Sequence, residues 1–446
     1  MDLDTPISWH PDRSWADPLI ALLALLALFA VGFTLRARQQ SARRPAERAS
    51  LQGRITEVAL AGPRLLVGRG TTAREWTKAV AQLTEPWDQA LLVVLKAELD
   101  HQGEDPIDGT NLVAPPGPAG ERFRRVWLAA HAGAALPDRA ERDEVHRRLG
   151  NGYAADLLEA RLRDREGGGD PLRAQARTAL RARLAGLGLL GLVVLGLAAG
   201  GVFVGIYLWV TREKVVPRPL PQWSLSGRAA TLVLLGWFLA FFVAGNLAAL
   251  LLLPWPGLRW LAVPLGTLFH AAFGIRLMCW AEGIGLGALW RRVAPGRLRQ
   301  DLAWGGAFLA LAVLLVIAVA LTSSLILKPE QSPQRDLQEL LRSLSGWGPS
   351  LILFLVVAGL APFFEELLFR GFLLPLLARG QGMALALAIS ALLFGAIHLQ
   401  PMGLPTLSML GLVLGLAMRH TGSLRTPILV HACWNGSLFL LMRAFA

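Results

Sequence analysis

The sequence predicts an all-α protein, a polytopic transmembrane helical bundle with a small helical soluble domain near its N-terminus. The 446 residues have a mean hydropathy of +0.46, and only 17% are charged, whereas soluble domains carry about 25% charged residues. Long apolar runs recur in the C-terminal half, and a membrane-spanning helix needs about 20 such residues. We expect about eight or nine spans.

The first apolar run, residues 18–35, is expected to be a transmembrane anchor, so residues 1–35 form the first predicted segment. The flank before this run is acidic, with Asp17 among its residues, and the flank after it begins with Arg36. A cleaved signal peptide carries positive charge before its apolar core. The reversed charge order favours an anchor.

Residues 36–183 are rich in Arg, Glu and Asp and contain no further apolar run of spanning length. We expect a small, mainly helical soluble domain. Thr72 and Glu75 have the spacing of a capping box at the start of a helix. Further helices are expected at 84–101, 121–134 and 138–165, with a proline-rich loop at 103–120. The domain shows no catalytic constellation.

From residue 184 onward the chain is expected to lie mostly in the membrane, with one span and a loop in 184–228 and the remaining bundle in 229–446. The candidate spans are 184–210, 229–253, 258–285, 303–327, 349–378, 382–399, 404–419 and 425–443. Arg291 and Arg292 indicate a cytoplasmic loop. Counting spans back from that loop places the soluble domain outside, while the arginines that flank it favour the inside, so its side stays open.

The formal net charge of +12 indicates lipid rather than nucleic acid as the charged partner. In a membrane protein, excess arginine is typical of cytoplasmic loops that face anionic lipid headgroups. No basic and aromatic platform is present, so we expect a lipid bilayer and no nucleic acid. Cys279 and Cys433 lie in apolar segments without metal-type spacing and are expected to be inert thiols.

Two adjacent glutamates, Glu365 and Glu366, interrupt a long apolar run. A carboxylate at bilayer depth costs roughly 2.5–3.5 kcal/mol on insertion scales, so each needs a polar partner. Arg370 follows Glu366 by four residues, which places an ion pair on one helix face. Glu365 has Phe369 at that spacing and therefore needs a partner from another helix.

Polar residues on later spans can supply that partner. His398 closes one span, and His431 and Asn435 share a face of the last span. A single polar stripe on a membrane helix faces the bundle interior or a water-filled cavity. A buried carboxylate such as Glu365 can act as a general base toward water, and a nearby imidazole can share the proton. A second imidazole and an amide can stabilise an oxyanion, so the set predicts amide hydrolysis.

Zinc is an open alternative. Two histidines and one carboxylate form the ligand set of many hydrolytic zinc sites, here Glu365, His398 and His431. The chain lacks an HExxH motif, and spacing does not decide between the two mechanisms. We favour metal-free glutamate chemistry without a cofactor. His270 lies in another span and is assigned a packing role.

Three ordered motifs resemble a known family. Glu-Glu-xxx-Arg at 365–370, Phe-xxx-His at 394–398 and His-xxx-Asn at 431–435 lie on successive apolar helices. This pattern is similar to that of the CPBP (CAAX protease and bacteriocin-processing) intramembrane proteases, which include the type II CAAX prenyl endopeptidases. The motif core covers about 350–443, the expected protease domain is 229–446, and the resemblance does not reach the soluble domain.

The resemblance implies a helical intramembrane peptidase with a conical water-filled cavity. Glu365 is similar to the catalytic glutamate, and His398 to its partner in activating water. His431 and Asn435 resemble the pair that stabilises the oxyanion. The supporting residues would be Glu366, Arg370 and Phe394.

The expected function is therefore endoproteolysis of a peptide or membrane-protein substrate close to the membrane surface. The resemblance to bacterial relatives implies a multi-pass protein of the bacterial cytoplasmic membrane. A non-catalytic scaffold or bacteriocin-immunity-type binding protein is the main alternative, and a transporter is a third. Position alone suggests that the soluble domain recruits a partner.

Overall fold

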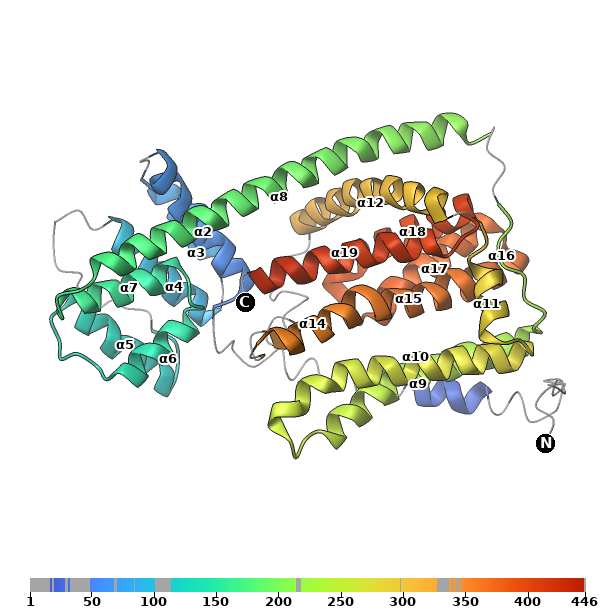
Figure 1. Ribbon diagram of the computed structural model, residues 1–446, viewed down its shortest axis with the longest axis horizontal. Helices are drawn as coiled ribbons and strands as arrows, with labels where there is room; N and C mark the ends of the chain where they lie inside the picture. Colours follow the sequence, from blue (N-terminus) through green and yellow to red (C-terminus); the bar gives the residue numbers. More distant parts are fainter. Residues whose placement is uncertain are drawn as a thin grey trace. The chain divides into compact units, whose positions relative to one another are not determined.

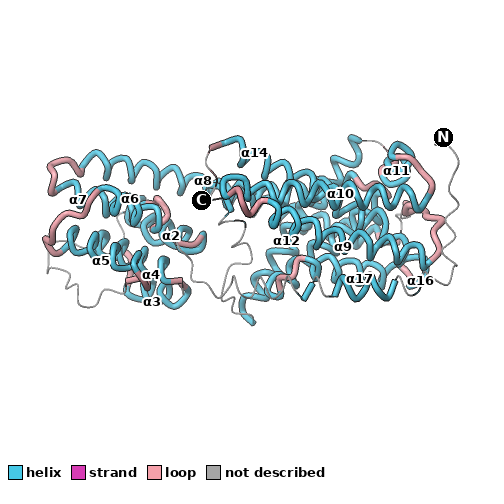
Figure 2. The backbone as a smooth tube through the Cα atoms, turned by 90° about the horizontal axis from the view of Figure 1, so that it is seen from below, coloured by secondary structure: helices cyan, strands magenta, loops and turns pink. Residues whose placement is uncertain are grey.

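The computed structural model describes residues 17, 20–28, 31–32, 49–67, 70–83, 85–100, 114–213, 218–296, 298–326, 337, 340–341, 344 and 346–444. Within these residues the regular secondary structure is entirely helical (Figures 1 and 2). The all-α fold class is confirmed. Of the predicted anchor at 18–35, residues 20–28 and 31–32 are described and are helical, whereas most of the predicted loop at 103–120 lies outside the described residues.

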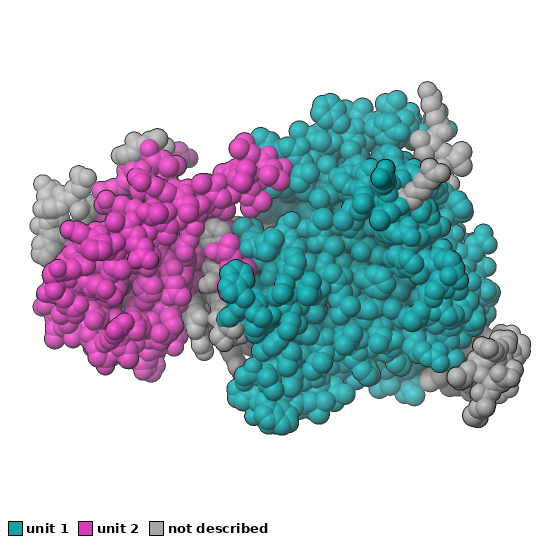
Figure 3. Space-filling model, viewed as in Figure 1, with its two compact units in different colours: residues 1–41, 194–329, 339–441 teal, residues 42–193, 330–338, 442–446 magenta. Residues whose placement is uncertain are grey.

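The chain forms two compact units (Figure 3). The membrane unit comprises 1–41, 194–329 and 339–441, and the N-terminal unit comprises 42–193, 330–338 and 442–446. The predicted boundaries after residues 35, 183 and 228 stay predictions.

The N-terminal unit is built from short helices: α2 (Leu51–Val67), α3 (Ala73–Gln82), α4 (Pro86–Asp100), α5 (Pro118–His131), α6 (Arg139–Arg148) and α7 (Tyr153–Asp164). The capping box of Thr72 and Glu75 at the start of α3 is confirmed. The continuous helix predicted over 138–165 is wrong. Gly150 and Asn151 have φ values of 88° and 53°, and a helix cannot continue through left-handed residues.

A buried ion pair within α2 also contacts the start of α7. Glu57 of α2 accepts hydrogen bonds from Arg54 Nε at 3.1 Å and from the backbone N–H of Ala154 at 2.6 Å. Ala154 lies in the first turn of α7, whose N-cap Gly152 has no capping side chain. Glu57 therefore supplies the negative charge that the N-terminus of α7 favours.

The membrane unit contains α8 (Asp170–Thr211, which begins in the N-terminal unit), α9 (Gly227–Leu251), α10 (Ala262–Glu282), α11 (Leu286–Val293), α12 (Leu298–Ile326), α17 (Met383–Ile397), α18 (Leu404–Thr421) and α19 (Arg425–Ala444). Six helical stretches among the described residues are long and apolar enough to cross a membrane. The chain is an integral membrane protein.

α17 is shorter than its neighbours. It covers 15 residues and ends at His398, its C-cap. The next residue, Leu399, has a φ of 52°, so the helix cannot extend further. α18 returns along α17 and also packs against α12.

One long, irregular helix carries the two glutamates. It runs through α14 (Trp347–Leu355), α15 (Ala361–Glu366) and α16 (Leu374–Gln381), joined by π-helical segments η3 (Val356–Leu360) and η4 (Leu367–Leu373). π-Helical turns are rare and are found often at functional sites. The glutamates lie between the two π segments.

Glycines allow α9 and α10 to approach closely. A Cβ on Gly274 would lie 2.3 Å from the ring of Trp237, and a Cβ on Gly266 would lie 2.8 Å from the Cα atom of Gly245. Small residues drive close packing of helices in membranes, where apolar burial gives no advantage over lipid. His270 lies one turn from each of these two α10 glycines.

We predict that Gly274→Ala destabilises the membrane unit, because the added methyl overlaps the buried ring of Trp237. Overpacking of this kind costs about 1–3 kcal/mol. Thermal unfolding in detergent measures the effect. Gly306→Ala is the matched control, since a Cβ there meets nothing within 4 Å. Equal melting temperatures for the two variants would contradict the prediction.

Candidate active site

The ion pair expected from the sequence forms in the centre of the bundle. Arg370 Nη1 lies 2.8 Å from Glu366 Oε1, and both side chains are 0% exposed. Arg370 Nη2 donates to the carbonyl of Gly411 on α18 at 2.8 Å. His431 of α19 places Nδ1 2.8 Å from the same Glu366 oxygen. One oxygen of Glu366 in α15 thus contacts both Arg370 and His431 of α19.

Phe394 of α17 forms the wall behind this group. The Arg370 guanidinium lies 4.4 Å from the centre of the Phe394 ring, a distance typical of a cation–π contact. The same ring packs edge-on against His398 and His431, with centroids 5.1 and 5.5 Å apart. Phe394 thereby fixes both imidazoles.

Glu365 faces the two histidines. Its Oε2 atom lies 4.0 Å from His398 Nε2 and 3.9 Å from His431 Nε2. This oxygen is buried and accepts no hydrogen bond from the described residues. The structure therefore brings together Glu365, His398 and His431, as the motif order predicted, from α15, the end of α17 and α19.

The partners of the two histidines determine which ring nitrogen faces Glu365. His398 Nδ1 lies 2.8 Å from the carbonyl of Phe394, and His431 Nδ1 contacts the Glu366 carboxylate. Both oxygens only accept, so each Nδ1 carries a proton and donates. The two Nε2 atoms lie 4.0 and 3.9 Å from Glu365 Oε2. The gaps of 3.9–4.0 Å are too long for direct hydrogen bonds and suit a bridging water.

The same distances test the zinc alternative. Zn–N and Zn–O bonds of about 2.0–2.2 Å place tetrahedral ligand atoms roughly 3.4 Å apart. The Glu365–His398 and Glu365–His431 separations are wider, and no set of three His, Cys, Asp or Glu side chains in the described part of the chain is arranged to hold a metal ion. The choice between zinc and metal-free chemistry stays a prediction.

Asn435 contacts the backbone of the glutamate helix. Its Nδ2 donates to the carbonyl of Val357 at 3.1 Å. In η3 the N–H of Ala361 donates to the carbonyl of Val356, five residues earlier. By the same spacing, the donor to the carbonyl of Val357 would be the N–H of residue 362, which is Pro362. Proline has no N–H. The amide of Asn435 replaces that missing donor.

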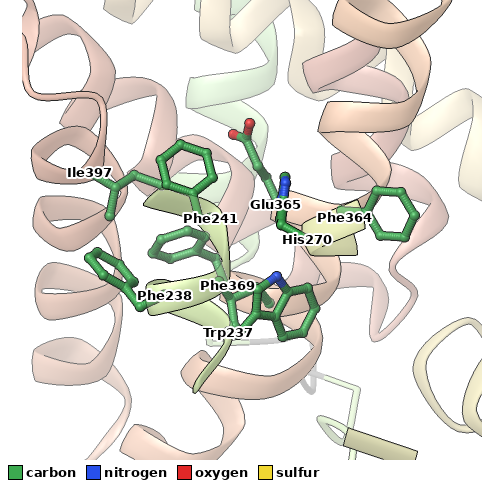
Figure 4. A pocket seen from close by; sticks show the side chains of 9 residues that line it. Trp237, Phe238, Phe241, His270, Phe364, Glu365, Phe369 and Ile397 are labelled. Atoms are coloured by element: carbon green, nitrogen blue, oxygen red, sulfur yellow. The ribbon is translucent and has the colours of Figure 1, made fainter. Parts of the chain in front are cut away.

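His270 also reaches the site, although the sequence assigned it a packing role. It lines a pocket together with Glu365, and aromatic or aliphatic side chains such as Phe241 form the rest of the wall (Figure 4). The sequence did contain a signal for this role: ionisable residues are rare within membrane spans, and those that occur usually face a functional cavity.

Comparison with known protein families bears on this arrangement. Residues 347–437 match the family model described as "Type II CAAX prenyl endopeptidase Rce1-like". The family resemblance that the three motifs indicated is confirmed for this segment. No curated protein and no solved structure matches the chain. The Rce1-like segment contains Glu365, His398 and His431, and the family indicates a protease of the membrane.

We predict that Arg370→Met destabilises the Rce1-like segment by about 3–5 kcal/mol, because the Glu366 charge is then left buried without its main partner. The double variant Arg370→Met with Glu366→Gln removes both charges and keeps an acceptor for His431. Its stability therefore falls by less than that of the single variant. Denaturant unfolding in detergent compares them. A double variant as unstable as the single one would refute this account.

We predict that Asn435→Leu lowers stability by about 1–3 kcal/mol, the cost of leaving a partly buried carbonyl unsatisfied, here that of Val357. In this background, Pro362→Ala restores part of the loss, since the alanine introduced at this position supplies an N–H. The same unfolding measurement compares all four combinations of the two positions. If Pro362→Ala has the same effect with and without Asn435, the two residues do not share Val357.

Proposed function

We propose that the chain is an intramembrane endopeptidase that hydrolyses a peptide bond near the membrane surface. The observation that carries this proposal is the convergence of Glu365 Oε2 with the Nε2 atoms of His398 and His431 at 3.9–4.0 Å. Ionisable side chains inside an apolar bundle are energetically costly, and where they occur they mark functional sites. The Rce1-like match over 347–437 supports the protease class.

Glu365 and His398 activate the attacking water. The Glu365 side chain is 20% exposed while its Oε2 atom is buried, so the carboxylate is weakly solvated. A water in the gap donates one hydrogen bond to Glu365 and the other to the Nε2 lone pair of His398. Glu365 takes the proton as the water oxygen attacks the peptide carbonyl, and later returns it to the leaving amine.

His431 and Asn435 stabilise the oxyanion of the tetrahedral intermediate. The contact of His431 Nδ1 with Glu366 at 2.8 Å fixes the ring and directs Nε2 into the site. In this role His431 acts as the imidazolium ion, which donates from Nδ1 to Glu366 and from Nε2 to the oxyanion. Asn435 uses one N–H for Val357, and its amide carries a second one. Arg370 acts indirectly, by holding Glu366 in place.

The substrate of this reaction is proposed to be a peptide or a membrane protein, and the membrane to be the bacterial cytoplasmic membrane. The N-terminal unit carries none of the three motifs, and we propose that it recruits a substrate or partner. The bundle supplies the chemistry.

We predict that Glu365→Gln and His398→Ala abolish proteolysis, lowering its rate by at least about 10²-fold. Proteomic comparison of membranes that carry the wild-type or Glu365→Gln protein reveals the substrate as a species that accumulates uncut. His420→Ala is the control for loss of a histidine, because His420 packs against Trp304 and Phe308 on another face of α18. Wild-type processing by Glu365→Gln would refute the mechanism and support a binding protein.

We predict that chelators leave the activity of the purified protein unchanged, because the proposed steps use only Glu365, His398, His431 and Asn435. The measurement is the cleavage rate of the accumulated species after dialysis against a zinc chelator. A loss of activity that added zinc restores would favour the zinc mechanism.

A further inference from the structure

A small cavity beside Glu365 has the size of one water molecule. Glu365 and His270 line it with apolar side chains of other helices (Figure 4). The space open to the centre of a water-sized sphere is about 20 Å³, and about 10–15 Å³ on this measure suffices for one water. The space between these side chains therefore has room for about one water.

The orientation of His270 is fixed on several sides. The side chain is buried, and Nδ1 lies 3.2 Å from the carbonyl of Gly266, so Nδ1 donates. The ring packs edge-on against Phe241 at 5.2 Å between centroids. The close approach of α9 at Gly266 and Gly274 holds this part of α10 against its neighbour. His270 cannot turn away without disrupting that packing.

These contacts leave Nε2 of His270 as an acceptor. No hydrogen bond among the described residues engages it. An acceptor that lines a pocket is stabilised by a hydrogen bond, and so is a poorly solvated carboxylate. Water can donate to both groups at once, whereas neither a carboxylate nor an unprotonated ring nitrogen can donate to the other. The pair of acceptors across a cavity of this size thus points to a water.

We propose that His270 is a positioning residue of the Rce1-like site. Its Nε2 holds a water that donates one hydrogen bond to the imidazole and one to the Glu365 carboxylate. This water is distinct from the attacking water. It keeps the carboxylate from rotating, so that Oε2 stays directed at the gap between His398 and His431. The inference rests on the proposed function and adds a fourth helical element, α10, to the site.

The kinetic test compares His270→Phe with His270→Gln, using the substrate that accumulates in the Glu365→Gln membranes. The Phe variant keeps an apolar ring but no acceptor, and its kcat falls roughly 10- to 100-fold, a loss typical of small misplacements of a catalytic group. KM stays within about twofold, because the substrate does not touch His270. His270→Gln retains an acceptor and restores most of kcat, and His420→Phe leaves kcat unchanged.

A wild-type kcat for His270→Phe would overturn the proposal, and so would an equal loss for Phe and Gln. The second measurement needs no activity: an experimental structure at a resolution that shows ordered waters. A water within hydrogen-bond distance of His270 Nε2 and Glu365, lost in His270→Phe, supports the proposal, and its absence from the wild type overturns it. Wild-type cleavage by Glu365→Gln would instead refute the proposed function, whatever the cavity holds.

Discussion

The guanidinium of Arg370 lies fully buried among apolar helices, and a charge in such surroundings must be matched by its immediate neighbours. Glu366, the Gly411 carbonyl and the ring of Phe394 provide this match. Glu366 in turn holds His431 by its Nδ1. The position of Nε2, which faces Glu365, therefore depends on a salt bridge that takes no part in chemistry.

A second constraint comes from the backbone. The π segments and Pro362 interrupt the regular hydrogen bonding of the long helix on both sides of the glutamates. In lipid, every freed backbone group needs a partner inside the protein. Asn435 meets that need for Val357, which ties α19 to the helix that carries Glu365. One side chain thus links the geometry of the backbone to that of the site.

Much of this arrangement could be predicted from residue spacing. The four-residue interval between Glu366 and Arg370 predicted their ion pair, and the absence of such a partner for Glu365 predicted contacts from other helices. His398 and His431 provide those contacts. The membrane helices were also predictable, because apolar length is a strong signal.

The rest depended on three-dimensional details that spacing does not contain. A π turn adds one residue to a helical turn, but residues 351–364 carry no charge and are apolar on nearly every side, so no periodic pattern was present to reveal the shift. Two of the predicted partners form their shortest contacts elsewhere: His431 with Glu366, and Asn435 with Val357. His270 was missed because α10 precedes the motif region, and only the fold brings it to Glu365.

The shortness of α17 has a consequence for the surrounding lipid. Fifteen residues at 1.5 Å each give a helix of about 22 Å, roughly 8 Å less than the hydrocarbon core of a typical bilayer. Lipids beside a short helix thin or tilt to match it. The headgroups then lie closer to the end of α17, where His398 lies, than they would beside a helix of full spanning length. Hydrophobic mismatch would bring interfacial water toward a site that the bilayer otherwise keeps dry.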